Sequence, residues 1–241
     1  MGYEFHFEVF DKYWTWIASG LGLTLYISVM GMFFALITGL LVALARISKS
    51  LPLALFGRAY IEFFRAIPLL VFIIWFYYGL AMVTGINFQP IMAGVICLTM
   101  QHAGYLAEIY RSGIQAVSKG QWEAAYSLGY SPARTFVKII APQAFKIVIP
   151  PTANQGVSML KDSALVSVIG VNELMRQSQI ATSNTFRPFE FYTVTALIYI
   201  VLTLCLSQVS RYLEFRMNTC LLYTSDAADE RSSVDLGGRR I

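Results

Sequence analysis

Charged residues inside apolar stretches are the first candidates for chemistry in this chain. Asn154, Ser158 and Lys161 recur at helical spacing and form a polar stripe, and Asp162 follows directly. A lysine and an aspartate offer a cation for the carboxylate and an anion for the ammonium group of a zwitterionic ligand. Neighbours on a helix point about 100° apart, so each charge can instead pair with another helix and fix its packing. Both interpretations stay open from the sequence.

Two further polar residues are candidates for the same path. Gln101 aligns with Tyr105 and Glu108 on one helical face, so a second helix is expected to contribute to a polar lumen. His102 beside it is interpreted as a buried imidazole with hydrogen-bond partners, with a proton relay as the alternative. Arg65 is the other candidate.

Opposite charges lie three residues apart at two places, Glu62 with Arg65 and Glu108 with Arg111. Residues at this spacing are neighbours on a helix, so each pair is expected to neutralise itself near the membrane boundary. Four more charges lie between the last two apolar stretches, where they belong to a solvated loop or meet a docking protein: Glu173, Arg176, Arg187 and Glu190.

Several catalytic patterns are absent from the 241 residues. There is no Gly-x-x-x-x-Gly-Lys-Ser/Thr phosphate loop, so ATP hydrolysis by the usual route is not expected on this chain. Neither His-Glu-x-x-His nor Gly-x-Ser-x-Gly occurs, and His and Cys residues do not cluster, which argues against a hydrolase and against a metal site. The net charge of +4 is too small for a nucleic-acid-binding protein. We therefore expect no enzyme, and no cofactor bound to this chain.

Long stretches without charge place these residues in a membrane. Hydrophobic residues make up 56% of the chain and charged residues 13%, and no charge falls in 16–45, 66–107 or 191–210. A bilayer core of about 30 Å needs about 20 apolar residues per helix. The predicted fold class is all-α integral membrane with about five transmembrane helices, the fourth interrupted at Pro150-Pro151. The spans are 17–45, 61–83, 90–110, 146–171 and 191–212.

Lys and Arg near the span ends are distributed unevenly between the two sides. Eleven lie with the connections at 46–65 and 111–146 and after the fifth span, and three lie on the other side. The first side is therefore predicted to be cytoplasmic. The N-terminal segment 1–16 is then external, and 17–217 forms the membrane domain.

The tail 218–241 departs from this pattern by becoming abruptly polar. A disordered cytoplasmic tail is one interpretation. The other starts from the run between Cys220 and Glu230, which resembles a translated sequencing adapter, so the tail is non-native read-through. No function is assigned to it in either case.

The largest predicted cytoplasmic connection, 111–145, contains two sets of helix signals. They are a Ser-x-x-Gln capping box at Ser118–Gln121, a left-handed helix end at Gly129, and an N-cap followed by proline at Ser131-Pro132. The second helix is expected to run to about Ala141. A compact helix-turn-helix under the membrane follows, with aromatic residues exposed for a protein interface, namely Trp122, Tyr126, Tyr130 and Phe136.

This loop resembles the EAA loop of ABC-importer permease subunits. It matches that motif at Glu123, Ala124, Ala125, Gly129, Ile139 and Pro142. The motif normally has Leu where this chain has Ala141, a mild apolar departure. Segments 22–25 (Gly-Leu-Thr-Leu), 64–70 (Phe-Arg-Ala-Ile-Pro-Leu-Leu) and 160–165 (Leu-Lys-Asp-Ser-Ala-Leu) are similar to the polar amino-acid uptake branch of that family. The resemblance covers about 14–217.

The resemblance implies the permease subunit of an ATP-driven, binding-protein-dependent importer of a polar amino acid or related zwitterion, in a bacterial inner membrane. An external solute-binding protein would deliver the ligand, and the permease would pair with itself or with a similar chain. ATP and Mg²⁺ would bind to a separate ABC ATPase. The docking residues would be the motif positions Glu123, Ala124, Ala125, Gly129, Ile139 and Pro142.

Two other functions are compatible with a polytopic membrane chain. An ion-gradient-driven secondary transporter is one, although such proteins often carry inverted repeats, and no two halves are evident here. A membrane scaffold is the other, but the intramembrane Lys161 and Asp162 would then be an unexplained cost. Only an importer permease requires the 111–145 loop to bind an ATPase.

Overall fold

The computed structural model describes residues 6–235, and every regular element among them is a helix. This agrees with the predicted all-α class. The α-helices are α1 (Phe10–Arg46), α2 (Leu51–Ala66), α3 (Leu69–Ile74), α4 (Leu80–Thr84), α5 (Pro90–Ala116), α6 (Lys119–Ser127), α7 (Pro132–Thr135), α8 (Ala141–Asp162), α9 (Leu174–Thr185) and α10 (Pro188–Asp235). Short 3₁₀ segments lie at Phe7–Val9 and Ser163–Ile169, and π-helical turns at Trp75–Gly79 and Phe136–Ile140.

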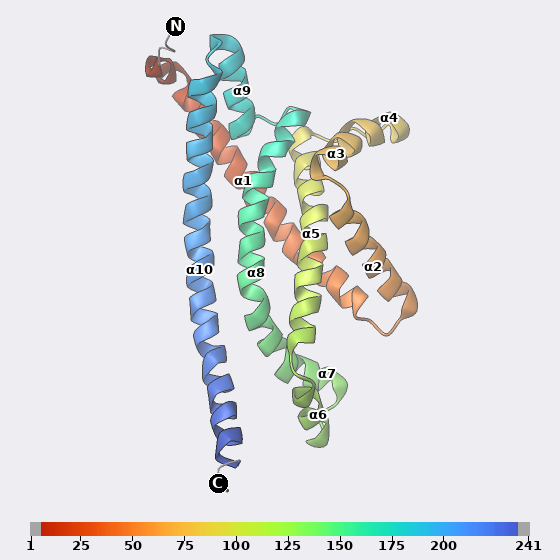
Figure 1. Ribbon diagram of the computed structural model, residues 1–241. Helices are drawn as coiled ribbons and strands as arrows, with labels where there is room; N and C mark the ends of the chain where they lie inside the picture. Colours follow the sequence, from red (N-terminus) through yellow and green to blue (C-terminus); the bar gives the residue numbers. More distant parts are fainter. Residues whose placement is uncertain (1–5, 236–241) are drawn as a thin grey trace.

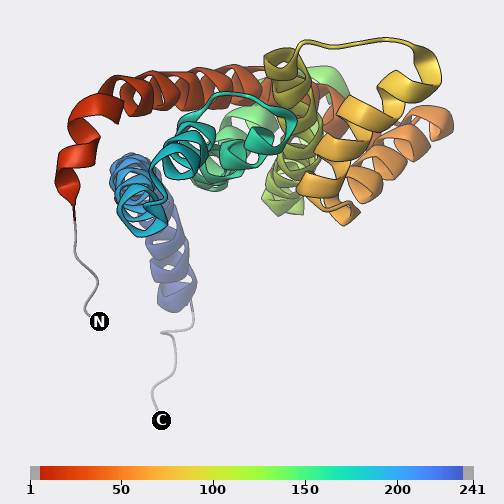
Figure 2. The same cartoon turned by 90° about the horizontal axis from the view of Figure 1, so that it is seen from above.

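The long helices run between two ends of the molecule (Figure 1). One end, here called the loop end, carries α6 and α7, and the other, the N-terminal end, carries the start of α1 together with α9. Helix α5 packs against α1, α2 and α8, and α10 packs against α8 and α9. Seen from above, α1 lies along one side of the α5–α8 pair (Figure 2).

A glycine allows α1 to lie directly on α5. A Cβ atom on Gly39 would stand 2.8 Å from the Leu106 Cβ atom and 3.1 Å from the Ala103 carbonyl oxygen, both on α5. Only a residue without a side chain permits such an approach. The helix–helix distance of this crossing is therefore a direct consequence of this glycine.

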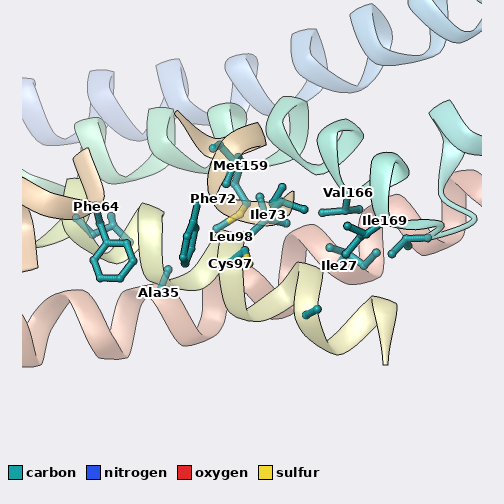
Figure 3. Close-up of a cluster of buried hydrophobic side chains, with 14 residues drawn as sticks. Ile27, Ala35, Phe64, Phe72, Ile73, Cys97, Leu98, Met159, Val166 and Ile169 are labelled. Carbon is teal, nitrogen blue, oxygen red and sulfur yellow. The ribbon is translucent and has the colours of Figure 1, made fainter. Parts of the chain in front are cut away.

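The main core lies where α1, α3, α5, α8 and the 3₁₀ segment meet. Figure 3 shows side chains from these elements interleaved around Leu98, with Ile73 and Met159 beside it, all three completely buried. Packed apolar contacts of this kind fix how the helices cross, and so fix where their polar faces point.

The predicted second span 61–83 is not one continuous helix. It breaks at Ile67 and Pro68, and the two arms, α2 and the α3–α4 stretch, meet at 104°. The residue before a proline is pushed out of the helical region, and Ile67 is extended at ψ 131°. The stretch predicted as the second span therefore consists of two helical arms joined by a sharp bend.

The predicted interruption of the fourth span at Pro150-Pro151 was wrong. Helix α8 runs through both prolines and changes to 3₁₀ geometry only after Asp162. Each proline removes a helical hydrogen bond, but α5 and α10 pack along α8 and hold it in place. Tertiary packing here outweighs local propensity.

Two helices, α1 and α10 up to Arg216, are long and apolar enough to cross a membrane, and the bent pair of α2 and α3–α4 makes a third. Helix α1 begins at Phe10, so residues 10–16 of the predicted external segment form its first turns, while residues 1–5 lie outside the described part. Helices α5 and α8 are long enough to cross a membrane, but their composition is not apolar enough to place them in this group. With 27 and 22 residues they extend about 40 and 33 Å.

Helix α10 continues to Asp235 and so includes most of the tail that begins at 218. Up to that residue the backbone is helical, which differs from a disordered tail. The foreign origin of the segment stays a prediction.

Candidate functional sites

The loop end contains the predicted helix-turn-helix. Helix α6 begins at Lys119, and Gly129 follows its end with φ +77°. The Gly129 N–H donates to the Tyr126 carbonyl at 2.9 Å, and the Tyr130 N–H donates to the Ala125 carbonyl at 3.1 Å. This pair of bonds is the Schellman motif, and it requires a left-handed residue at the position of Gly129.

The start signals of the two loop helices differ in how they act. The Ser131 hydroxyl accepts a hydrogen bond from the Arg134 N–H, which is the predicted N-cap. Ser118 makes no side-chain cap bond, so the capping box itself is not formed although the helix starts where expected. The Gln121 side chain instead accepts from the Gln143 amide on α8 at 3.4 Å.

The sequence suggested that the second loop helix ends at about Ala141, but the helix continues past this residue. The chain passes from α7 through the π-helical turn Phe136–Ile140 directly into α8. The Ala141 N–H reaches back five residues to the Phe136 carbonyl. A π turn widens the helix one turn before Pro142, which gives the proline ring room.

The motif residues of the loop divide into exposed and packed positions. Four are exposed: Glu123, Ala124, Gly129 and Pro142. Ala125 is buried at 1% exposure, and Ile139 packs on a cluster around Val117, Ile140 and Ala144. These two small or apolar residues therefore shape the loop from inside.

The predicted exposure of the loop aromatics holds for one of the four. Tyr126 is 45% exposed, whereas Trp122 and Phe136 pack on the same inner cluster as Ile139, and Tyr130 is half-buried. Trp122 and Phe136 thus hold the loop against α5 and α8. The aromatic surface left for a partner is therefore smaller than the sequence suggested.

A polar cavity of about 430 Å³ lies between α2–α3, α5 and α8. We call it the polar pocket. It brings together four of the six path residues predicted from sequence, which come from three separate segments of the chain. Its lining consists of Arg65, Ala66, Ile67, Pro68, Leu69, Gln101, Tyr105, Gln155, Ser158 and Asp162.

Arg65 reaches the polar pocket because Glu62 pairs elsewhere. Glu62 accepts from the Arg58 Nε at 2.7 Å, so the predicted Glu62–Arg65 pair is not formed. The Arg65 guanidinium lies 5.5 Å from the centre of the Tyr105 ring. The other predicted pair is confirmed, since the Arg111 Nε donates to Glu108 at 2.9 Å.

Gln101 on α5 forms a hydrogen bond to the backbone at the bend of the second span. Its amide nitrogen donates to the Ile67 carbonyl at 2.8 Å, and the side chain is almost fully buried. This carbonyl is at the break before Pro68, so the bond anchors the bend on α5.

His102 connects α5 to the acidic side of the pocket. The Gln155 amide nitrogen lies 2.7 Å from His102 Nδ1, so this ring nitrogen is the acceptor and the ring proton belongs on Nε2. Nε2 lies 3.3 Å from an Asp162 carboxylate oxygen. The buried imidazole therefore has a hydrogen-bond partner at Nδ1, as the favoured interpretation required, whereas Nε2 only lies near the carboxylate and makes no hydrogen bond within residues 6–235.

Two predicted path residues lie outside the polar pocket. Asn154 accepts a hydrogen bond from the Ser210 hydroxyl at 2.8 Å and so ties α8 to α10. Lys161 is exposed and does not line the cavity. Tyr105 and Gln155 also line the cavity, and Tyr105 lies on the helical face that the sequence had indicated together with Gln101.

Glu173 and Glu190 are both fully buried, with 0% exposure. Neither carboxylate is therefore in a solvated loop or available to a docking protein. Glu173 caps α9, and burial raises the pKa of its carboxyl although four hydrogen bonds act in the opposite direction. No pattern in the sequence distinguishes these carboxylates from exposed ones.

A family profile described as "Binding-protein-dependent transport system inner membrane component" matches residues 31–219. The chain belongs to this family. The permease is 42% identical over 194 residues, 80% of its length and 89% of the relative, to "Probable glutamine ABC transporter permease protein GlnM" of Bacillus subtilis. It is 34% identical over 203 residues to the arginine transport system permease protein ArtQ of the same organism, covering 84% of this chain and 93% of that one.

A solved structure shares both fold and sequence with the permease. The crystal structure of an amino acid ABC transporter with histidines matches with a TM-score of 0.85 and 41% identity, covering 89% of this chain and all of that one. The protein is thus an ABC-importer permease of the polar amino-acid branch. It is a transport subunit and not an enzyme, because the ATPase of such importers is a separate subunit.

Proposed function

We propose that the permease imports a polar amino acid through the polar pocket, with Arg65 facing the ligand carboxylate and Asp162 facing its ammonium group. The observation that carries this proposal is their convergence. Residues far apart in the sequence, from α2 and α8, line one cavity that also holds Gln101 and Ser158. A cation and an anion in the lining of one cavity match the charges of a zwitterion, and the polar side chains beside them suit a polar substituent.

The contacts around Asp162 support its role as a fixed anion. The Nε2 atom of His102 lies 3.3 Å from the carboxylate, and the ring is oriented by Gln155 through Nδ1. Ser158 lies on the same face of α8 one turn earlier. A carboxylate held from one side keeps its remaining lone pairs for a ligand ammonium.

The two path candidates outside the pocket have other roles in this proposal. Asn154 fixes α8 to α10 through Ser210. Lys161, exposed one residue before Asp162, is a second cation on the route to the pocket. The relatives are named for glutamine and for arginine. The proposed substrate class is therefore a polar amino acid without further restriction.

The loop end is the proposed docking surface for the ATPase. Glu123, Ala124, Gly129 and Pro142 present the contact surface, and Ala125 and Ile139 keep its shape. ATP and Mg²⁺ bind to that partner in this proposal. Closure of the ATPase is transmitted through α7 into α8, because the π turn joins these two helices without a break.

The remaining features of the assembly follow the family. The permease pairs with a second copy or a similar chain, and a solute-binding protein docks on the N-terminal end. Five helical passages cross the membrane, with α5 and α8 hiding their polar residues inside the bundle. Figure 1 places the start of α1 and the loop end at opposite ends of the molecule, which accords with an external N-terminus and a cytoplasmic loop.

The test is transport by proteoliposomes that hold the permease with its ATPase and binding protein. Loss of one charge-assisted hydrogen bond costs about 1.5–3 kcal/mol, so Arg65→Gln and Asp162→Asn should each raise KM by about 10- to 150-fold. Lys49→Gln is the control, since Lys49 is an exposed cation just before α2 and lies outside the pocket.

The outcome is read across a panel that includes glutamine and arginine. Unchanged uptake kinetics of both pocket variants for every amino acid would remove the pocket from the path. If only Lys161→Ala impairs uptake, the ligand follows the exposed side of α8 instead. Co-purification with the ATPase shows that each variant is assembled.

A further inference from the structure

A buried carboxylate joins three helices at the N-terminal end of the permease. Glu173 accepts hydrogen bonds from the N–H groups of Met175 and Arg176 at the start of α9, at 2.9 and 2.8 Å. It also accepts from the Tyr199 hydroxyl on α10 at 3.0 Å and from the Thr24 hydroxyl on α1 at 3.4 Å. Its four partners thus come from three separate helices.

The contact between α1 and α9 is closed by more than the carboxylate. The Leu174 N–H donates to the Thr24 hydroxyl oxygen at 3.1 Å. Gly20 lies one turn before Thr24, and a Cβ atom there would stand 3.0 Å from the Leu174 Cα atom. Helix α9 therefore rests on the backbone of α1 itself.

The contact between α9 and α10 has a second hydrogen bond. The hydroxyls of Ser178 and Thr195 bond to each other and are both buried. Apolar side chains around Leu174 and Phe191 complete the contact. In Figures 1 and 2 the start of α1, helix α9 and the start of α10 lie together at this end.

We propose that Glu173 is a positioning residue of transport. Its hydrogen bonds permanently hold the N-terminal halves of α1 and α10, with α9 between them, as one rigid body, and we call this contact the staple. Opening the staple would separate the buried carboxylate from the Tyr199 hydroxyl on α10 and the Thr24 hydroxyl on α1, at a cost in free energy. Movement of α8 relative to this body is then taken up between Asp162 and Glu173. That stretch contains the 3₁₀ segment and Gly170, whose φ of +83° is a glycine conformation.

The test replaces the Ser178–Thr195 hydrogen bond with a disulfide. Hydroxyls in contact place the sulfurs of Ser178→Cys and Thr195→Cys within bonding reach. The three native cysteines are replaced by alanine in all variants. The full complex in proteoliposomes, with ATPase and binding protein, is assayed for uptake and for binding-protein-stimulated ATP hydrolysis, oxidised and after reduction.

With Glu173 intact, uptake should be the same in the oxidised and reduced states. Uptake that is lost on oxidation and regained on reduction would overturn the proposal, since the contact would then have to open in every cycle. This arm needs no change at Glu173, so it decides the question even if Glu173 variants fail to assemble.

In the second arm Glu173→Ala should lower stimulated uptake by about tenfold or more. The disulfide between positions 178 and 195 should restore the uptake of the Glu173→Ala variant, and reduction of the disulfide should lower that uptake again. A disulfide that forms but restores nothing would show that the carboxylate acts in another way, and would overturn the positioning role. Glu173→Gln keeps the cap acceptor and should retain uptake. Ser183→Ala, which removes a hydrogen bond within α9, is the matched control.

Discussion

Gly129 gives a quantitative test of the loop as the ATPase-docking surface. Its φ of +77° belongs to the left-handed region, which costs a residue with a side chain roughly 1–2 kcal/mol. A Cβ atom at Gly129 would meet nothing within 4 Å in the permease, so a substitution introduces no clash there. In the free Gly129→Ala variant the turn can therefore leave the left-handed conformation, and it must return to that conformation when the loop docks.

The expected effect on binding follows from that strain. A cost of about 1–2 kcal/mol on docking weakens the Kd for the ATPase by about 5- to 30-fold. Gly129→Asn should lose less, since asparagine tolerates the left-handed region. Gly129→Asp should lose more than asparagine because it adds a charge to the interface.

The assay is titration of detergent-solubilised permease with its ATPase, followed by ATP-hydrolysis rates of the complex. Gly120→Ala is the control, because Gly120 lies in the same loop, is exposed and has equally open surroundings, but has no left-handed φ. Wild-type affinity of Gly129→Ala would refute the reasoning that the loop docks in its observed conformation. Equal losses at both glycines would show that the added methyl group, and not the turn, weakens binding.

Two further predictions concern stability, and both are measured as thermal unfolding of the permease–ATPase complex. Gly39→Ala should lower the free energy of unfolding by about 1–3 kcal/mol, because its Cβ would stand 2.8 Å from the Leu106 Cβ. Gly22→Ala is the control, since a Cβ atom there meets open space and should not change stability. Equal effects of the two substitutions would contradict the close α1–α5 crossing. Burial raises the pKa of Glu173, so its contribution is present below the ordinary pKa of a glutamate and is lost as pH rises through the raised value. The wild type should therefore lose stability between acidic and alkaline pH more steeply than Glu173→Gln, and identical slopes would contradict this origin.

Local signals located the turn of the loop and the starts of its helices correctly from the sequence. The end of α6 at Gly129 and the N-cap at Ser131 depend on hydrogen bonds within a few residues, so the residues themselves carry the information. The charge-free stretches indicated a helical membrane protein for a similar reason, because hydrophobicity is a property of each segment alone. The family motif added the partner and the direction of transport.

Other features depended on which helices face each other, and only the tertiary structure decided them. Helix α8 passes through Pro150-Pro151 because its neighbours hold it, while Pro68 bends the chain where Gln101 can take up the freed carbonyl. The pairing of charged side chains depends most on the tertiary structure, because a charge has no preferred partner until the helices pack. Arg65 meets Asp162 across a cavity, and Glu173 becomes a buried staple between helices, by virtue of long-range packing that no local pattern encodes.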